Sequence, residues 1–285
     1  MKRESALVIE GGGTRNVFTA GVLEAFLENE YNPFKYFIAV SGGAYTVASY
    51  LSKQHKRNYG IFTNIMTTDF FSFKRFLSGG HYMDLDWLWT NVIENYPFDF
   101  KNMEKNLKGK KFIGVITKET CAGKNFIEAA YESIDTDNLP AVFKSGASIP
   151  FFYKAKKNKN NELLLDGGIM DPLPVRKAYH QGYRKIVVIR TYPGNTIPGS
   201  GLYKIILKLA GKRKLLHYLS LSQQKYKDAF DFIDNPPSDV IIDIISPGAA
   251  LESVTNTSCR KKIIKDYYTG KEIGDKYIAK IKENK

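Results

Sequence analysis

Two units of the same kind fill about the first fifty residues, and they restrict the fold more than any other feature of the sequence. In each unit a short apolar run ends in a glycine-rich turn, and residues with helical spacing follow. The apolar runs are Ala6–Ile9 and Tyr36–Val40, and the helical patterns begin at Val17 and Ala44. Continuous apolar runs of this length are typical of strands buried on both faces. Their alternation with helices predicts an α/β fold with a mostly parallel central sheet.

The rest of the chain continues this alternation. We expect further strands at Lys111–Thr117, Asn125–Ala129, Glu162–Leu165, Lys185–Thr191 and Val240–Ile245. A short helix is expected at Pro174–Gln181, closed by Gly182, and the sequence from Ser253 onward is mostly helical and basic in pattern. No repeat or low-complexity linker divides the sequence, which predicts one domain over residues 1–285, with core motifs in 5–195 and a final strand and helices in 200–285.

Apolar content and the lack of a membrane-spanning run place the chain among globular proteins. The chain has 285 residues and a hydrophobic content of 43%, enough for a sizeable core. It has no apolar run of about 18 residues that would span a membrane. Ala6–Ile9 is too short for a secretory signal, which predicts a cytoplasmic location. Cys121 and Cys259 form neither a disulfide framework nor a metal-ligand spacing, so we expect both to be buried or half-buried, with no metal or cofactor.

The formal net charge of +13 indicates a polyanionic partner. Nucleic acid is not favoured, because no recognition helix, zinc spacing or ribonucleoprotein-type strand is present. Residues 202–219 combine apolar residues with lysines and arginines in an amphipathic pattern, which suits the surface of an anionic membrane. The same pattern also suits a surface helix with a solvated cationic face, and Gly211 weakens the prediction of a single helix. We expect peripheral contact with an anionic membrane.

Ser41 stands between a predicted strand and a predicted helix. A sharp turn at this point presents a side chain at the carboxyl edge of a parallel sheet. Small neighbours let the strand and the helix approach each other; here they are Ala39 and Gly43, with Ala39 where the pattern Gly-x-Ser-x-Gly has glycine. A serine in this setting is either a nucleophile or a helix N-cap.

A serine nucleophile needs a base, and Asp166 is the candidate. It ends the apolar run Leu163–Leu165 and precedes Gly167–Gly168, which allow close backbone approach. We expect its carboxylate at the same carboxyl edge as Ser41, although an Asp-Gly-Gly sequence is also a common turn. A Ser-Asp-His triad would instead need His180 or His217, and both are expected to be exposed.

The glycine-rich loop Gly11–Arg15 follows the first predicted strand directly. The backbone N–H groups of Gly11, Gly12 and Gly13, helped by the helix dipole, suit an oxyanion. Arg15 would orient the loop or meet a phosphate headgroup. The competing interpretation is a nucleotide-phosphate cradle. No Gly-Lys-Ser or Gly-Lys-Thr follows the loop, however, and Asn16 stands where a dinucleotide fingerprint needs glycine.

These three motifs, in this order and spacing, resemble the patatin-like phospholipase family, which carries Gly-Gly-Gly-x-Arg, Gly-x-Ser-x-Gly and Asp-Gly-Gly. A fourth segment, Ser145–Pro150, is similar to the small-residue stretch that the family carries before its aspartate. The resemblance covers residues 5–195 well. It implies a three-layer α/β/α sandwich and a lipid acyl hydrolase with a Ser41–Asp166 dyad that needs no metal.

Three activities fit these residues. The first is hydrolysis of acyl esters of phospholipid, lysophospholipid or neutral glyceride, and the second is acyl transfer to an alcohol by the same residues. The third is lipid or phosphate binding without catalysis. Aromatic residues are dense in 59–100, which predicts either a helical insertion packed on the core or the wall and cap of an acyl-chain pocket.

Overall fold

Parallel strands form the centre of the sheet, as the alternation in the sequence predicts. The computed structural model describes residues 4–120, 126–199, 208 and 211–283. Within them a seven-stranded sheet has the order β4-β3-β2-β1-β6-β7, with β5 paired to β3 beside this path. The parallel strands are β1 (Ser5–Ile9), β2 (Phe34–Val40), β3 (Lys111–Thr120), β6 (Lys185–Ile189) and β7 (Ile241–Ile245). Strands β4 (Phe126–Ser133) and β5 (Glu162–Asp166) run antiparallel to β3.

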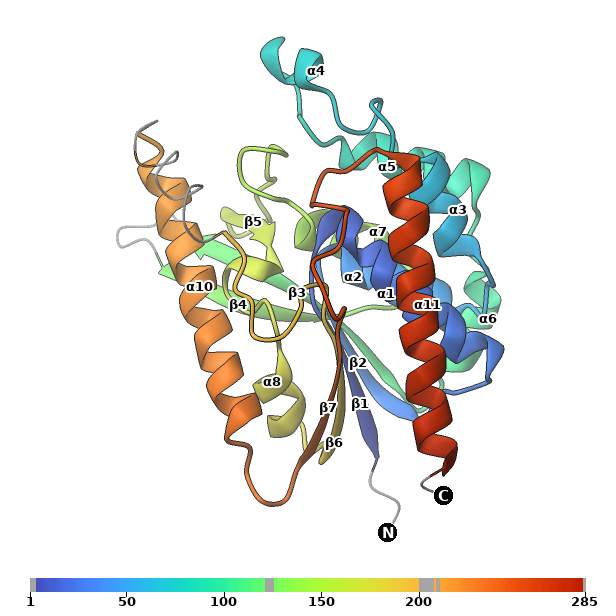
Figure 1. Ribbon diagram of the computed structural model, residues 1–285. Helices are drawn as coiled ribbons and strands as arrows, with labels where there is room; N and C mark the ends of the chain where they lie inside the picture. Colours follow the sequence, from blue (N-terminus) through green and yellow to red (C-terminus); the bar gives the residue numbers. More distant parts are fainter. Residues whose placement is uncertain (1–3, 121–125, 200–207, 209–210, 284–285) are drawn as a thin grey trace.

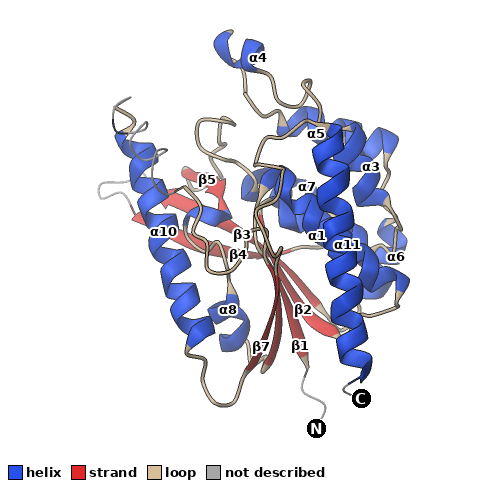
Figure 2. Cartoon of the chain, in the orientation of Figure 1, coloured by secondary structure: helices blue, strands red, loops and turns tan. Residues whose placement is uncertain are grey.

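Helices cover both faces of the sheet, so the α/β/α sandwich is confirmed (Figures 1 and 2). One face carries α1 (Asn16–Glu28), α2 (Gly42–Leu51), α3 (Arg57–Asn64), α5 (Leu85–Asn95), α6 (Phe100–Leu107), α7 (Leu139–Gly146) and α11 (Arg260–Glu283). The other carries α8 (Val175–His180) and α10 (Arg213–Asp234). Strand β1 alternates between the two cores: Leu7 and Ile9 pack in the first, Ala6 and Val8 in the second. This two-sided burial is why the strand is apolar throughout.

The last helix packs against the first through glycines. A Cβ at Gly21 of α1 would lie 2.0 Å from the Tyr267 carbonyl oxygen, and one at Gly270 of α11 would lie 2.0 Å from that of Phe18. The two backbones therefore approach more closely than any side chain would allow. This contact places the segment before α11 beside the start of α1, where the glycine-rich loop lies.

The aromatic-rich stretch is a helical insertion that includes α3, the short α4 (Phe73–Leu77) and α5. Phe62, Phe70 and Phe71 are buried in it, whereas Phe73 is exposed. No helix in the described part of the chain is both long and apolar enough to span a bilayer.

Two expectations about local features need correction. Cys259 is exposed and not buried, because it lies in the loop before α11, while Cys121 lies outside the described residues. The strand expected at Asn125–Ala129 is β4, which continues to Ser133 because it pairs with β3 as far as Ile113.

Of the amphipathic stretch 202–219, residues 202–207, 209 and 210 also lie outside the described residues. Helix α10 begins at Arg213, after Gly211 at φ +66°.

Candidate active site

Ser41 occupies a strained turn between β2 and α2. Its backbone has φ 52° and ψ −130°, a left-handed conformation that is uncommon for residues other than glycine. It stands at the N-cap position of α2, yet its side chain accepts no capping hydrogen bond. The residue is 8% exposed, and its hydroxyl is not used to stabilise the helix. This geometry favours a chemical role over the capping role.

Small residues beneath the turn hold it in place. A Cβ at Gly43 would lie 2.6 Å from Ile9 Cγ2 and 3.1 Å from the Glu10 carbonyl oxygen, so α2 begins in direct contact with the end of β1. Ala39 is completely buried in the core on the side of α1 and α2. Its methyl group is accommodated there, and the following turn still places Ser41 at positive φ.

Asp166 reaches Ser41 by a route that the sequence analysis did not foresee. β5 is antiparallel to β3, so Asp166 does not end a parallel strand as expected. β4 occupies one edge of β3 from Ile113 to Thr120, which leaves the other edge to β2 and β5 together.

The register places the ends of β2 and β5 against each other. Val40, the last residue of β2, pairs with Val115 of β3. Asp166, the last residue of β5, pairs with Ile116, the next residue along. The two strands meet end to end, with Ser41 directly after one and Asp166 closing the other. Gly167 is required here, because a Cβ on it would lie 2.3 Å from the Val115 carbonyl oxygen.

The Asp166 carboxyl is more basic than an ordinary aspartate. Burial raises its pKa to about 6, while the adjacent Ser41 hydroxyl and the Gly168 N–H act in the opposite direction. The Gly168 N–H donates to Oδ1 at 2.8 Å. Oδ2 is buried and has no hydrogen-bond partner among the described residues. This oxygen is therefore free to accept a proton or a further hydrogen bond.

The glycine-rich loop lies against Ser41. A Cβ at Gly11 would lie 3.1 Å from Ser41 Cβ, and one at Gly13, at φ +56°, would lie 2.4 Å from the Thr255 carbonyl oxygen. The Thr14 N–H donates to that carbonyl. In the described part of the chain the N–H groups of Gly11, Gly12 and Gly13 make no backbone hydrogen bond. They are therefore available to a negatively charged oxygen beside Ser41.

Arg15 fastens this loop to the segment before α11. Its Nη1 donates to Thr255 Oγ1 at 3.1 Å, and its guanidinium lies 4.2 Å from the centre of the Tyr192 ring. Nε is buried and has no hydrogen-bond partner among the described residues. These contacts are compatible with a role of Arg15 in orienting the loop, and the side chain also lines the cleft described next.

Two cavities of different character meet at Ser41. A narrow pocket of ≈ 50 Å³ leads from it beneath the insertion, and its lining is almost wholly apolar, including Tyr45, Met66, Phe70, Leu88 and Val92. An open cleft of ≈ 650 Å³ lies on the other side, lined among others by Gly11, Gly12, Arg15, Asp166, Tyr192 and Lys212. Ser41 and Gly13 line both. Part of the aromatic stretch therefore does form a pocket wall.

The four histidines lie elsewhere. His180 and His217 are exposed on α8 and α10, and no histidine is among the residues that line the narrow pocket or the cleft. His55 contacts Glu24 at 3.0 Å, and His81 accepts from the Lys154 N–H at 3.0 Å. The arrangement therefore favours a two-residue site over a triad. In the described ranges no three His, Cys, Asp or Glu side chains are grouped to hold a metal.

A buried ion pair supports the loop from below, and the sequence analysis missed it. Glu10 and Arg190 are both almost fully buried, with Glu10 Oε1 3.3 Å from Arg190 Nη2. Glu10 also accepts from the Thr191 N–H, which ties the end of β1 to the end of β6. The signal was present as a glutamate between an apolar strand and three glycines, but its partner lies far along the chain.

The fold and the site define an α/β protein with a serine in a strand-turn-helix and a buried aspartate as its neighbour. The chain matches the family described as Patatin-like phospholipase over residues 7–179, and it belongs to that family. The members of this family are lipid esterases. Residues 212–284 match a second family, described as Domain of unknown function (DUF6363).

One curated relative is the uncharacterized protein YjjU of Escherichia coli K12, which is 30% identical over 281 residues that cover 97% of this chain and 77% of YjjU. Among solved structures, VipD from Legionella pneumophila is similar with a TM-score of 0.46 and 13% identity, over 96% of this chain and 66% of VipD. Human GIVD cytosolic phospholipase A2 is similar with a TM-score of 0.42 and 12% identity, over 74% of this chain and 45% of that chain.

Proposed function

We propose that this protein is a lipid acyl hydrolase in which Ser41 is the nucleophile and Asp166 the base. One observation carries the proposal. The Ser41 hydroxyl, which makes no helix-capping hydrogen bond, stands in a strained turn beside a buried carboxyl whose pKa is raised to about 6. Family membership supports the same class of reaction.

Acylation begins when Asp166 takes the proton of the Ser41 hydroxyl. The serine oxygen attacks the ester carbonyl carbon, and the N–H groups of Gly11, Gly12 and Gly13 stabilise the oxyanion. Collapse of this intermediate breaks the bond to the alcohol, which leaves with the proton from Asp166. The fatty acyl group stays on Ser41.

Deacylation repeats these steps with water. Asp166 takes a proton from a water molecule, whose oxygen attacks the acyl carbonyl carbon. The bond to Ser41 then breaks, the serine oxygen recovers the proton from Asp166, and a fatty acid leaves. An alcohol in place of water would give acyl transfer, so product analysis with and without glycerol separates the two.

The two cavities suggest how a lipid is held. The narrow apolar pocket suits an acyl chain, because burial of each CH₂ is worth about 0.8 kcal/mol. The open cleft suits the alcohol portion, and Arg15 and Lys212 give it a cationic lining that fits a phosphate headgroup. We propose phospholipid, lysophospholipid or glyceride as substrate, met by a cytoplasmic enzyme at an anionic membrane surface.

A fluorophosphonate probe tests the nucleophile. Wild-type protein is expected to be labelled and to hydrolyse a medium-chain p-nitrophenyl ester, whereas Ser41→Ala should do neither. Ser222→Ala is the matched control, because Ser222 also lines the cleft but donates its hydroxyl to the Gly168 carbonyl oxygen at 2.6 Å. Labelling of the folded Ser41→Ala protein would contradict the assignment of Ser41 as nucleophile. No labelling of the wild type would contradict the proposal and favour lipid binding without catalysis.

A further inference from the structure

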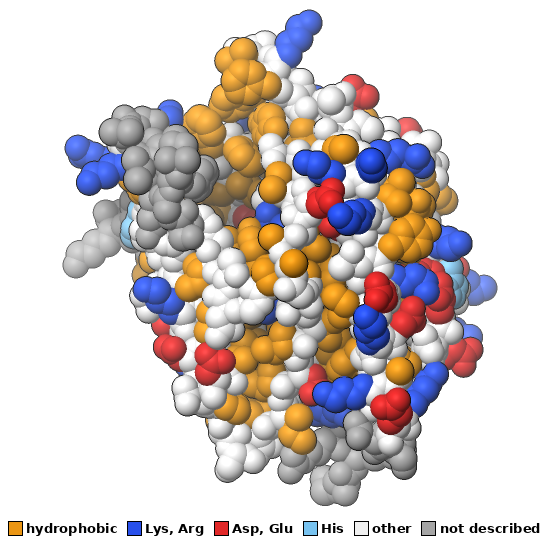
Figure 3. Space-filling model, in the orientation of Figure 1, with side chains coloured by type: hydrophobic (Ala, Val, Ile, Leu, Met, Phe, Trp, Pro, Cys, Tyr) orange, Lys and Arg blue, Asp and Glu red, His pale blue; other side chains and the backbone are white. Residues whose placement is uncertain are grey.

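The helix α4 exposes large apolar side chains at one end of the molecule. It stands beyond the other helices at the end of the sheet where the catalytic cleft opens (Figure 1). Phe73 and Leu77 are 64% and 71% exposed, the two most exposed large hydrophobic residues in the described part of the chain. Figure 3 shows hydrophobic side chains gathered at this end, with a lysine or arginine beside them. Apolar surface concentrated in this way indicates an interaction site.

Aromatic contacts connect this tip to the cleft. The Phe73 and Phe76 rings are 6.2 Å apart, and the Phe76 and Phe151 rings are 5.1 Å apart. Phe151 is half exposed and lines the cleft that contains Ser41 and Asp166. It has φ +76°, a conformation that is rare for a bulky residue. The apolar surface is therefore continuous from α4 to the mouth of the candidate active site.

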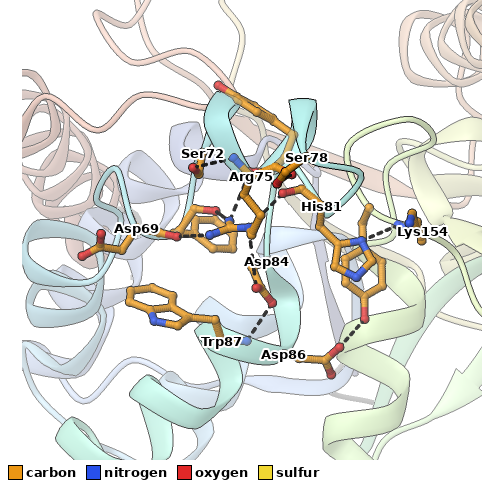
Figure 4. A network of polar contacts seen from close by, with 12 residues as sticks. Asp69, Ser72, Arg75, Ser78, His81, Asp84, Asp86, Trp87 and Lys154 are labelled. Carbon is orange, nitrogen blue, oxygen red and sulfur yellow. Dashed lines mark hydrogen bonds and ion pairs between the residues drawn. The ribbon is translucent and has the colours of Figure 1, made fainter.

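The tip is braced, so its exposure is not that of a frayed loop. Arg75 donates to the carbonyl oxygens of Asp69 and Phe70 at 2.8 Å and to that of His81 at 2.9 Å (Figure 4). The Arg75 side chain thus links the backbone before α4 to the backbone after it. The Lys154 N–H donates to His81 Nδ1 at 3.0 Å, which joins this loop to the one that carries Phe151.

Exposed cationic residues lie on three segments at or near the apolar tip. Residues 72–81, 150–161 and 211–218 contain no aspartate or glutamate. Exposed lysines stand on all three segments, and among the described residues Lys74, Lys159 and Lys212 have no ion-pair partner. Lys212 Nζ lies 4.8 Å from the centre of the Phe151 ring. Exposed apolar side chains with unpaired lysines near them match the interface of an anionic bilayer.

We propose that α4 and Phe151 form the surface by which this protein docks on an anionic lipid bilayer. Phe73 and Leu77 insert at the interface, the lysines contact headgroup phosphates, and the cleft opens toward the lipid. The role of docking in catalysis rests on the proposed function, but the binding itself does not. A second copy of the chain is a poorer partner, because two such faces would bring like charges together.

Vesicle sedimentation in the Ser41→Ala background tests the docking, because no lipid is consumed. Binding to phosphatidylglycerol-containing vesicles is expected to fall about tenfold or more in Phe73→Ser/Leu77→Ser, since two inserted apolar side chains are lost. The matched control is Ile241→Ser. Ile241 is 52% exposed but pairs with Lys185 at the opposite end of the parallel strands, so its substitution should leave binding unchanged.

Activity of the same substitutions with Ser41 intact completes the test. The double variant should keep wild-type hydrolysis of a soluble p-nitrophenyl ester, which also shows that it folds, and lose hydrolysis of vesicle lipid. Unchanged vesicle binding in the double variant, or equal binding to phosphatidylcholine vesicles at high salt, would overturn the proposal. A lower molecular mass of the double variant than of wild type, measured by light scattering, would overturn the proposal in favour of a second copy of the chain. Vesicle binding by a wild type that hydrolyses no ester would support docking and refute the proposed function alone.

Discussion

Two aspartates in one short segment, Asp166 buried and Asp171 half-buried, occupy regions of different character. Burial raises the pKa of both Asp166 and Asp171 to about 6. Asp166 lies in the cleft beside Ser41, with Oδ2 unpartnered in the described structure. Asp171 Oδ2 instead accepts from Tyr131 Oη at 2.6 Å, in a separate cavity lined by Lys177 and, among the described residues, by no serine. The comparison suggests that a raised pKa is a useful sign of a base only where the carboxyl lies in a cleft beside a candidate nucleophile.

The largest expected difference between the two regions is in turnover. Asp166→Asn removes the group that accepts the Ser41 proton, so kcat for a p-nitrophenyl ester should fall by about a thousandfold. Asp171→Asn leaves the cleft intact and should stay within about threefold of wild type. Equal losses in the two folded variants would show that Asp166 acts through structure, as Asp171 does.

The pH dependence sharpens the comparison further. Asp166 is a base only when ionised, and its pKa is about 6 instead of 3.8. The value of kcat/KM should therefore fall about tenfold per pH unit below pH 6. The Asp171→Asn profile should superimpose on that of wild type after scaling. A midpoint near pH 4, or one that moves in Asp171→Asn, would contradict the assignment of Asp166.

The smallest expected effect is on stability. A carboxyl whose pKa is raised in the folded state stabilises the fold when protonated, and this contribution is lost as the pH rises through about 6. Between pH 5 and pH 7 the free energy of unfolding should decrease in wild type. The decrease should be about 1 kcal/mol smaller in Asp171→Asn, which lacks the titrating carboxyl. Urea titrations at both pH values measure this. An identical pH dependence would contradict the raised pKa of Asp171.

The motifs nearest the first two strands could be predicted from sequence. The turn at Ser41 and the loop Gly11–Arg15 each depend on residues close together in the chain, and the structure brings both to one cleft. The α/β fold was confirmed, since apolar strands with glycine turns and helices leave few alternatives. The catalytic roles of Ser41 and Asp166, the extent of the domain and the membrane contact stay predictions.

Other features were beyond sequence reasoning. Phe71 and Phe73 look alike in an aromatic-rich segment, yet one is buried and the other is exposed on α4. The ion pair between Glu10 and Arg190 joins residues far apart in the chain, and neither residue alone identifies the other. Cys259 was expected to be buried or half-buried because of its residue type, but it is exposed in a surface loop.

What the sequence by itself determined is the local backbone at each motif. Glycines permit the loop conformations and the close approach of strand and helix, and apolar runs specify strands buried on both faces. Only the tertiary structure decided that Asp166 meets Ser41, because that depends on β5 entering antiparallel on the edge of β3 that β2 leaves free. Strand direction and register are set by pairing and packing among distant segments, and no residue near Asp166 encodes them.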